Sequence, residues 1–225
     1  MIKVKTILLK FSAPLQAYGT SSHFETRHTD YYPSKSAVIG MIAGSLGYRR
    51  DETEKIKRLK DINFAVRVDQ EGTLLRDYHT AKKYKANGDF ERTYVTNRYY
   101  LQDAVFVVGI SSEDEGLMAE IEEGLKYPYF QNFLGKRSLP PTADYILCVS
   151  DKELIEALSE TEWQASDWYK KKKKNKNTNK ISIYADSHLI KTKTNTLRKD
   201  DFLSFSNLSR EHAFRYEGKI EIEVR

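Results

Sequence analysis

A stretch of alternating basic and aromatic residues from Arg76 to Arg98 offers the chemistry of nucleic-acid binding. It carries six basic and three acidic residues, and aromatic rings lie between the basic ones. Arg and Lys neutralise phosphates and flat rings stack on bases, the two components of single-strand recognition. Tyrosine is also common in strands for packing reasons, so the pattern alone leaves a structural interpretation open. The candidate contacts are Arg76, Tyr78, His79 and Lys82.

The N-terminal region holds a second group of candidate contacts. Gln16 can both donate to and accept from a base edge or a phosphate. Arg27 can bind a phosphate through two parallel hydrogen bonds. Ser34, Lys35 and Ser36 begin a predicted helix, where hydroxyls, an ammonium group and free amides form an anion site. Capping of this helix by Ser34 is the structural alternative, and both roles are compatible.

A third group of candidates lies in a short basic turn. A glycine there lets the backbone approach a phosphate closely, and two cations follow it. A solvated loop is the alternative interpretation. The residues are Gly135, Lys136, Arg137 and Ser138.

Cysteine and histidine usage argues against metal and disulfide chemistry. Cys148 is the single cysteine, and the five histidines are scattered without the paired spacing of a zinc site. Neither an apolar leader nor an apolar run long enough to span a bilayer occurs. We therefore expect a reduced, cytoplasmic protein without a metal, a cofactor or a membrane association.

An enzymatic role is the main alternative to simple binding. Metal-independent RNA cleavage needs a base for the 2′-hydroxyl, an acid for the leaving oxygen and a cation near the phosphate. Tyr48, His79 and Lys82 are the residues that such chemistry could recruit. Their spacing does not require such chemistry.

Charge is unevenly distributed along the chain. The formal net charge is +5, but the run 170–180 contains seven lysines and no acidic residue. Its composition is typical of a solvated loop. Residues 111–125 carry six acidic residues and no basic one, which predicts separate acidic and basic faces.

Hydrophobic periodicity predicts the elements that position these residues. Strands are expected over 2–11, 62–69, 104–110 and 144–149, and helices over 34–48, with an extension at 51–60, and over 113–126. The order β, α, β, β, α, β predicts a ferredoxin-like α+β fold, the platform of the RNA-recognition motif. Gly40, Gly44 and Gly47 recur along the first helix, which suggests close packing of that helix on the sheet.

Two regions lie outside this core pattern. Residues 73–100 contain Asn87-Gly88, a strong turn signal, and predict a hairpin that projects about 30 Å from the sheet. Residues 151–225 combine a short helix, the lysine run and further strand-like segments. We therefore divide the chain into a domain over 1–150, including the hairpin, and a smaller β-rich lobe over 151–225.

Sequence blocks along most of the chain resemble a known family. The N-terminal blocks 8–19 (LLKFSAPLQAYG), 24–29 (FETRHT) and 33–47 (PSKSAVIGMIAGSLG) resemble the signature of Cas family five. The blocks 75–80 (LRDYHT), 129–141 (YFQNFLGKRSLPP) and 209–216 (SREHAFRY) resemble its version in type I-E CRISPR Cascade complexes. The lysine run matches no block of that family.

The resemblance implies a non-catalytic RNA-binding subunit of ferredoxin-like fold. Such proteins, members of the RAMP superfamily, hold the 5′ handle of the CRISPR RNA at one end of the surveillance complex. Their projecting hairpin, the thumb, reaches across the guide RNA toward the neighbouring backbone subunit. The implied partners are the CRISPR RNA, the Cascade backbone subunit, the large subunit and target DNA near the guide.

Two alternatives stay open at this stage. Relatives in other CRISPR subtypes cut the precursor RNA without metal, so an endoribonuclease is the first alternative. The second is a generic RNA-binding scaffold outside CRISPR. The lack of a basic-Gly-aromatic-Gly/Ala-Phe run counts against an ordinary RNA-recognition motif.

Overall fold

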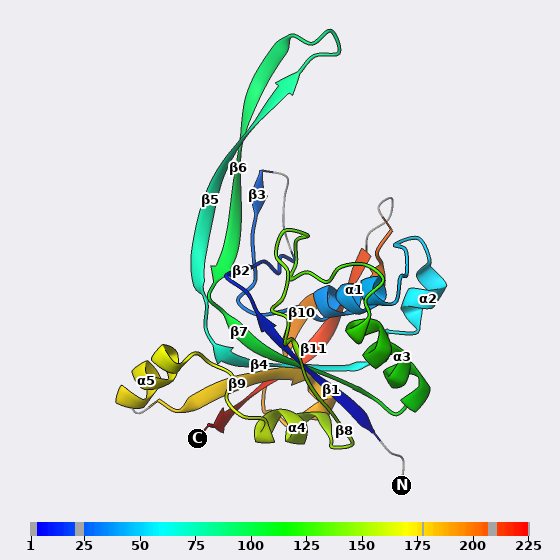
Figure 1. Cartoon of the computed structure of the whole chain (residues 1–225), viewed down its shortest axis with the longest axis vertical. Helices are drawn as coiled ribbons and strands as arrows, with labels where there is room; N and C mark the ends of the chain where they lie inside the picture. Colours follow the sequence, from blue (N-terminus) through cyan, green and yellow to red (C-terminus); the bar gives the residue numbers. More distant parts are fainter. Residues whose placement is uncertain (1–3, 21–24, 177, 207–210, 225) are drawn as a thin grey trace.

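The computed structural model describes residues 4–20, 25–176, 178–206 and 211–224. Residues 2, 3, 24, 177, 209 and 210 of the expected elements and blocks lie outside these ranges. The fold is built on one seven-stranded antiparallel sheet with the order β10-β11-β9-β4-β7-β1-β8 (Figure 1). Its strands are β1 (Lys5–Ser12), β4 (Asn63–Gln70), β7 (Val105–Ser112), β8 (Ile146–Ser150), β9 (Lys180–Asp186), β10 (Thr196–Ser204) and β11 (Glu211–Glu223).

Helices cover both faces of the sheet and enclose two apolar layers. On one face lie α1 (Lys35–Ser45) and α3 (Glu115–Lys126), whose apolar side chains meet Ile7, Leu9 and Phe106. On the other face α4 (Leu154–Glu160) packs on Leu8 and Val107. The alternation of residues 7, 8 and 9 between these layers is the expected period of a strand that is buried on both sides. The mixed α+β architecture predicted from the sequence is confirmed.

The second strand of the core is more deeply buried than its alternation indicates. Alternating apolar and polar residues, as in 62–69, are typical of a half-buried strand, yet Arg67 and Asp69 on β4 are fully buried. The Arg67 guanidinium donates to the carboxylate of Asp69 at 2.7 and 2.8 Å, and to the carbonyl oxygens of Leu158, Thr161 (2.7 Å) and Glu162 (2.9 Å). The polar face of β4 is therefore closed over by the segment after α4.

The C-terminal strands do not form a lobe of their own. β9 pairs with β4 through Ala65 and Ala185, and β11 and β10 add two further strands outside it. This pairing satisfies the backbone groups that β4 would otherwise leave open at the sheet edge. The expected second lobe is thus a continuation of the first sheet.

The lysine run is largely helical. Residues 170–175 belong to α5 (Asp167–Asn175), so the prediction of a loop there is wrong. Lysine has a good intrinsic helix propensity, and buried Tyr169 anchors the helix on the protein. Composition alone did not reveal this tertiary anchor.

A long hairpin projects from the sheet, as the sequence predicted (Figure 1). Its legs are β5 (Thr73–Tyr84) and β6 (Phe90–Gln102), and Gly88 at the turn has a φ of 88°. Two short strands, β2 (Leu15–Gln16) and β3 (Thr26–Arg27), pair with the basal part of β6. The remaining short helices are α2 (Thr53–Lys57) and η1 (Ser187–Leu189).

Candidate nucleic-acid interface

A groove of about 940 Å³ lies along the outer side of α1. It brings together parts of four of the sequence blocks, 8–19, 33–47, 129–141 and 209–216. Its floor is made of small residues of α1, and basic residues surround it. The lining residues are Ala17, Tyr18, Gly19, Ser34, Ser36, Ala37, Gly40, Met41, Ala43, Gly44, Tyr48, Arg49, Arg50, Asp51, Ile56, Phe130, Gln131, Phe133, Gly135, Arg137, Phe205 and His212.

The glycines of α1 open this groove and do not pack against the sheet. A Cβ added at Gly44 would meet no atom within 4 Å, and Gly40 is exposed. Gly47 follows the helix with a φ of 76°, the left-handed conformation that commonly ends helices. Our expectation that these glycines mediate the close packing of the helix on the sheet is therefore wrong, and the missing side chains leave room for a ligand.

The glycine-containing basic turn is fastened directly beside the first sequence block. Gly135 has a φ of 91°, and a Cβ there would lie 1.6 Å from the carbonyl oxygen of Ala17. The Ala17 amide donates to Leu134 at 3.2 Å, and Leu134 donates to Leu139 at 2.7 Å. Only glycine permits this approach, so the turn holds one wall of the groove in a fixed position.

The other residues of the turn have different surroundings. Arg137 is exposed, lines the groove and, within the described ranges, forms no ion pair. Lys136 is half-buried: its Nζ donates to the hydroxyl of Tyr100 at 2.7 Å and lies 4.0 Å from the centre of that ring. Ser138 is exposed beside them. Arg137 is thus free to bind a phosphate, whereas Lys136 connects the turn to the hairpin.

Gln16 is a structural residue of the interior, which contradicts its assignment as an RNA contact. It has no exposed surface. Its Nε2 donates to the carbonyl oxygen of Ala104 at 2.7 Å, and its Oε1 accepts from the Tyr18 hydroxyl at 2.6 Å. Burial raises the pKa of Tyr18 well above its ordinary value, which keeps this donor protonated.

Two of the three candidate residues at the start of α1 also have structural roles. Ser34 is buried and its side chain accepts from the amide of Ala37 at 3.3 Å, so it caps the helix. Lys35 is buried, and its Nζ donates to Asp186 at 3.0 Å. Its assignment as a phosphate ligand is therefore wrong. Ser36 is partly exposed and lines the groove.

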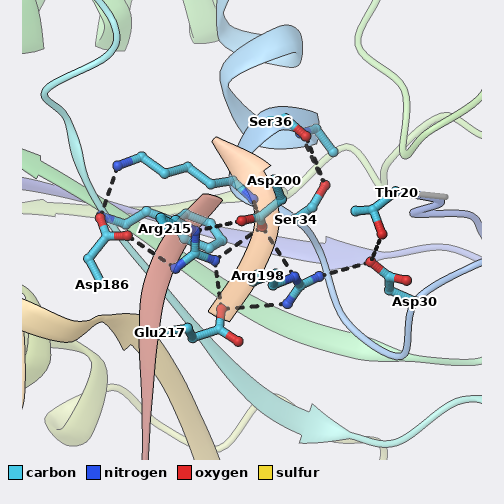
Figure 2. Close-up of polar contacts among 12 residues, drawn as sticks. Thr20, Asp30, Ser34, Ser36, Asp186, Arg198, Asp200, Arg215 and Glu217 are labelled. Atoms are coloured by element: carbon cyan, nitrogen blue, oxygen red, sulfur yellow. Dashed lines mark hydrogen bonds and ion pairs between the residues drawn. The ribbon is translucent and has the colours of Figure 1, made fainter. Parts of the chain in front are cut away.

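Lys35 belongs to a buried ion network that joins α1 to the C-terminal strands. Figure 2 shows its members Asp186, Asp200, Arg215 and Glu217. Arg215 donates to Asp200 at 2.7 Å, to Glu217 at 2.6 Å and to Asp186 at 3.1 Å. Asp200 also accepts from the Lys35 amide at 2.9 Å. Although burial lowers the pKa of Arg215, these carboxylates together raise it above its ordinary value. The network positions the first turn of α1, which faces the groove.

The hairpin register separates the predicted contacts onto two faces. Arg76, Tyr78 and Lys82 alternate along one face of β5, and Tyr78 is 61% exposed. The register pairs Arg76 with Tyr99 and Tyr78 with Asn97, so these residues share that face. The Arg76 Nε donates to Asn97 Oδ1 at 2.9 Å. This side of the arm combines a cation with exposed rings.

His79 lies on the opposite face of the hairpin, 3.9 Å from Asp77. Tyr48 follows α1, and its hydroxyl donates to Glu120 of α3 at 2.8 Å. Burial and this hydrogen bond raise the pKa of Tyr48, which disfavours the phenolate that a general base requires. The residues considered for RNA cleavage, including Lys82, are therefore not brought together.

Contacts at the root of the hairpin were only partly found from the sequence. Arg27 is exposed on β3 and pairs in register with Arg98. His28 and Tyr99 stack with ring centres 5.3 Å apart and an angle of 12°. The buried Nε of Arg98 has no hydrogen-bond partner among the described residues. The parallel pairing of β3 with β6 decides these contacts, and no local pattern indicates it.

Neither a metal centre nor a membrane span emerges from the described parts of the chain. Within them, His, Cys, Asp and Glu side chains nowhere form a group of three that could hold a metal ion. Every helix there is too short or too polar to cross a bilayer.

Comparison with known proteins gives concordant matches over most of the chain. The profile of the family described as CRISPR-associated protein (Cas_Cas5) matches residues 6–215. The CRISPR system Cascade subunit CasD of Escherichia coli (strain K12) is 33% identical over 151 residues, 60% of this chain and 67% of that protein.

Solved structures agree with this match. A chain of a CRISPR RNA-guided surveillance complex is 29% identical, with a TM-score of 0.77 over 97% of this chain and 90% of that one. A crystal structure of a Cas protein is 26% identical, with a TM-score of 0.71 over 97% of this chain and 95% of that one. The resemblance drawn from the sequence blocks is thereby confirmed.

Proposed function

The chain belongs to the Cas5 family of CRISPR-associated proteins, and from this premise we propose that it is the guide-RNA-binding subunit of a type I-E Cascade surveillance complex. The observation that carries this function is the likeness, over nearly the whole chain, to a chain of an RNA-guided surveillance complex. The subunit acts in antiviral DNA interference by holding the guide. Its cytoplasmic location follows from that role.

The groove along α1 receives the 5′ handle of the CRISPR RNA. Its small-residue floor admits a nucleotide, and exposed Arg137 provides a cation for a phosphate. Arg27 and Arg76 at the root of the hairpin extend the basic surface, and Tyr78 offers a ring for stacking. The interface that we propose thus keeps Arg27, Ser36, Arg76, Tyr78, Lys82, Gly135, Arg137 and Ser138 and leaves out the buried Gln16 and Lys35.

The hairpin formed by β5 and β6 is the thumb of this subunit. Its outer part extends far from the sheet and is almost entirely exposed, which suits contact with other molecules (Figure 1). It reaches across the guide toward the Cascade backbone subunit. The large subunit and target DNA near the guide are the further partners.

The half of the sheet that carries the thumb is ferredoxin-like. The strand order β4-β7-β1-β8 supports this assignment. In this order α1 connects β1 to β4 across β7, and α3 connects β7 to β8 across β1. The three C-terminal strands are an addition to that unit at the β4 edge.

The subunit binds without catalysis. Two observations support this: His79 and Lys82 lie on opposite faces of the hairpin, and the Tyr48 hydroxyl is held by Glu120. A metal-independent nuclease would need these groups within hydrogen-bond reach of one phosphate.

The decisive experiment follows binding and cleavage of end-labelled repeat RNA by the full chain without added metal. We expect binding that depends on the handle sequence, and an intact RNA. Arg27→Ala and Arg137→Ala should each weaken binding by about tenfold or more, since a charge-assisted hydrogen bond contributes roughly 1.5–3 kcal/mol. Arg58→Ala is the matched control, because this exposed arginine instead pairs with Glu120 at 3.0 Å.

Other outcomes would support the alternatives. Cleavage at one position of the repeat that His79→Ala or Tyr48→Phe abolishes would identify an endoribonuclease. Equal affinity for scrambled handles would indicate a generic RNA-binding scaffold.

A further inference from the structure

Helix α5 is held rigidly at the end of β4 by contacts on one of its sides. Tyr169 is buried, and its hydroxyl accepts from the amide of Glu71 at 3.3 Å. Just before the helix, Ser166 donates to the Gln70 side chain from its amide at 3.0 Å and its hydroxyl at 2.7 Å. The Trp163 indole donates to the Asp69 carbonyl at 2.8 Å. The helix therefore has a defined outer surface.

That outer surface is strongly positive, although Asp167 and Trp168 in the first turn are also exposed. The helix contains five consecutive lysines and one aspartate. Lys171, Lys172 and Lys174 are exposed and, in the part of the chain that the structure describes, form no ion pair. Like charges three or four residues apart on a helix repel each other and destabilise the helix. A bound polyanion would remove this repulsion.

The basic surface of α5 is separate from the groove along α1. Tyr169 belongs to the same apolar cluster as Ile181 of β9. Ile181 and Ile183 are two residues apart on this strand and so point to the same face, and Ile183 packs in the layer beneath α4. Helix α5 therefore lies on the α4 side of the sheet. α1 lies on the opposite face of the sheet, where the first turn of the helix faces the groove (Figure 1). One nucleic-acid segment in the groove would leave the lysines of α5 available to another.

We infer that α5 binds the phosphate backbone of double-stranded DNA. The exposed Lys171, Lys172 and Lys174 lie within about 4.5 Å along the helix axis, a charge density nearer to the roughly 1.7 Å per charge of a DNA duplex than to that of a single strand. A single strand has about half that density. Lysines are point charges that bind phosphates without reading bases, so contact should be independent of sequence. The choice of duplex DNA as the ligand depends on the proposed role in a DNA-targeting complex. The basic surface itself depends only on the observed residues of α5.

The test compares the full chain with the triple variant Lys171→Ala, Lys172→Ala, Lys174→Ala. Binding of a fluorescent DNA duplex unrelated to any guide is measured over a series of salt concentrations. The variant should bind at least about tenfold more weakly, and the slope of log affinity against log salt should fall by roughly 2 to 3. Alanine is a strong helix former, so α5 should stay folded.

The matched control removes three exposed lysines elsewhere: Lys126→Ala, Lys152→Ala, Lys219→Ala. It changes the net charge equally and should retain most of the affinity and slope. Handle-RNA binding by the α5 variant should remain normal, which separates this inference from the proposed function. Equal losses of DNA affinity in both triple variants would overturn the inference. So would tighter binding of single-stranded DNA or duplex RNA than of duplex DNA by the unsubstituted chain. An α5 variant that binds duplex DNA normally but fails to assemble with the other subunits would also overturn it.

Discussion

The Gln16 side-chain amide joins the first sequence block to a distant backbone segment of the interior. Its nitrogen donates to Ala104, eighty-eight positions along the chain, and its oxygen accepts from Tyr18. A buried donor or acceptor that loses its partner costs far more than an average hydrogen bond contributes. At the residue scale, Gln16 of the first sequence block therefore stabilises the interior, whereas Arg137 and Ser36 line the groove.

Gln16→Leu should lower the free energy of unfolding by about 1–3 kcal/mol, because the Ala104 carbonyl and the Tyr18 hydroxyl lose their partner. Urea denaturation followed by circular dichroism measures this loss. Gln131→Leu is the control, since Gln131 is exposed at the groove. A Gln16→Leu protein of normal stability that had lost its handle RNA would restore Gln16 as a direct ligand.

The hairpin is an element whose outer part contributes little to the core. Beyond His79 on β5 every side chain is exposed, and β6 becomes buried only toward its end, at Thr96 and Leu101. The arm is held by its own ladder and by β2 and β3 at the root. Its outer part therefore adds little to stability, which suits the contacts with other molecules that we propose for it.

Replacing residues 80–95 by Asn-Gly should leave the free energy of unfolding within about 1 kcal/mol, since the new turn closes on the existing pair His79 and Thr96. Assembly with the backbone subunit, assayed by co-purification, should be lost. Arg137→Ala, which keeps the arm, should instead weaken RNA binding. Normal assembly of the shortened protein would contradict the assignment of the hairpin as the thumb.

At the scale of the whole molecule, the buried ion network joins the two ends of the chain. Lys35 and Asp186 are 151 positions apart, yet their side chains meet at 3.0 Å beneath α1. Arg215 contacts three carboxylates on β9, β10 and β11. The C-terminal strands thus position the first turn of the helix that borders the groove.

Arg215→Met should destabilise the protein by about 3–5 kcal/mol, because three buried carboxylates then share only Lys35 and Arg198 as cations. Chemical denaturation measures the change. Lys219→Met, an exposed position on the same strand, should alter stability by less than about 1 kcal/mol. Similar effects of the two substitutions would show that the network adds no specific stability.

Local signals in the sequence determined much of this protein. Apolar periodicity identified the core strands and the two larger helices to within a few residues, and Asn87-Gly88 identified the projecting hairpin. These signals depend on neighbours in the chain, which is why they are readable without a structure. The family blocks added the RNA-binding role. Exposed candidates such as Arg27, Tyr78 and Arg137 were found because charge and aromaticity are properties of the residue itself.

Only the tertiary structure decided which of the polar candidates are exposed and which are buried. Gln16 and Lys35 have the same chemistry as RNA contacts, but distant segments bury and satisfy them. Arg76 and Tyr99 share one face of the hairpin because of the strand register. The lysines 170–174 are helical because buried Tyr169 anchors α5 on the protein. Each outcome arises from a contact between residues far apart in the sequence, and composition and periodicity carry no information about such contacts.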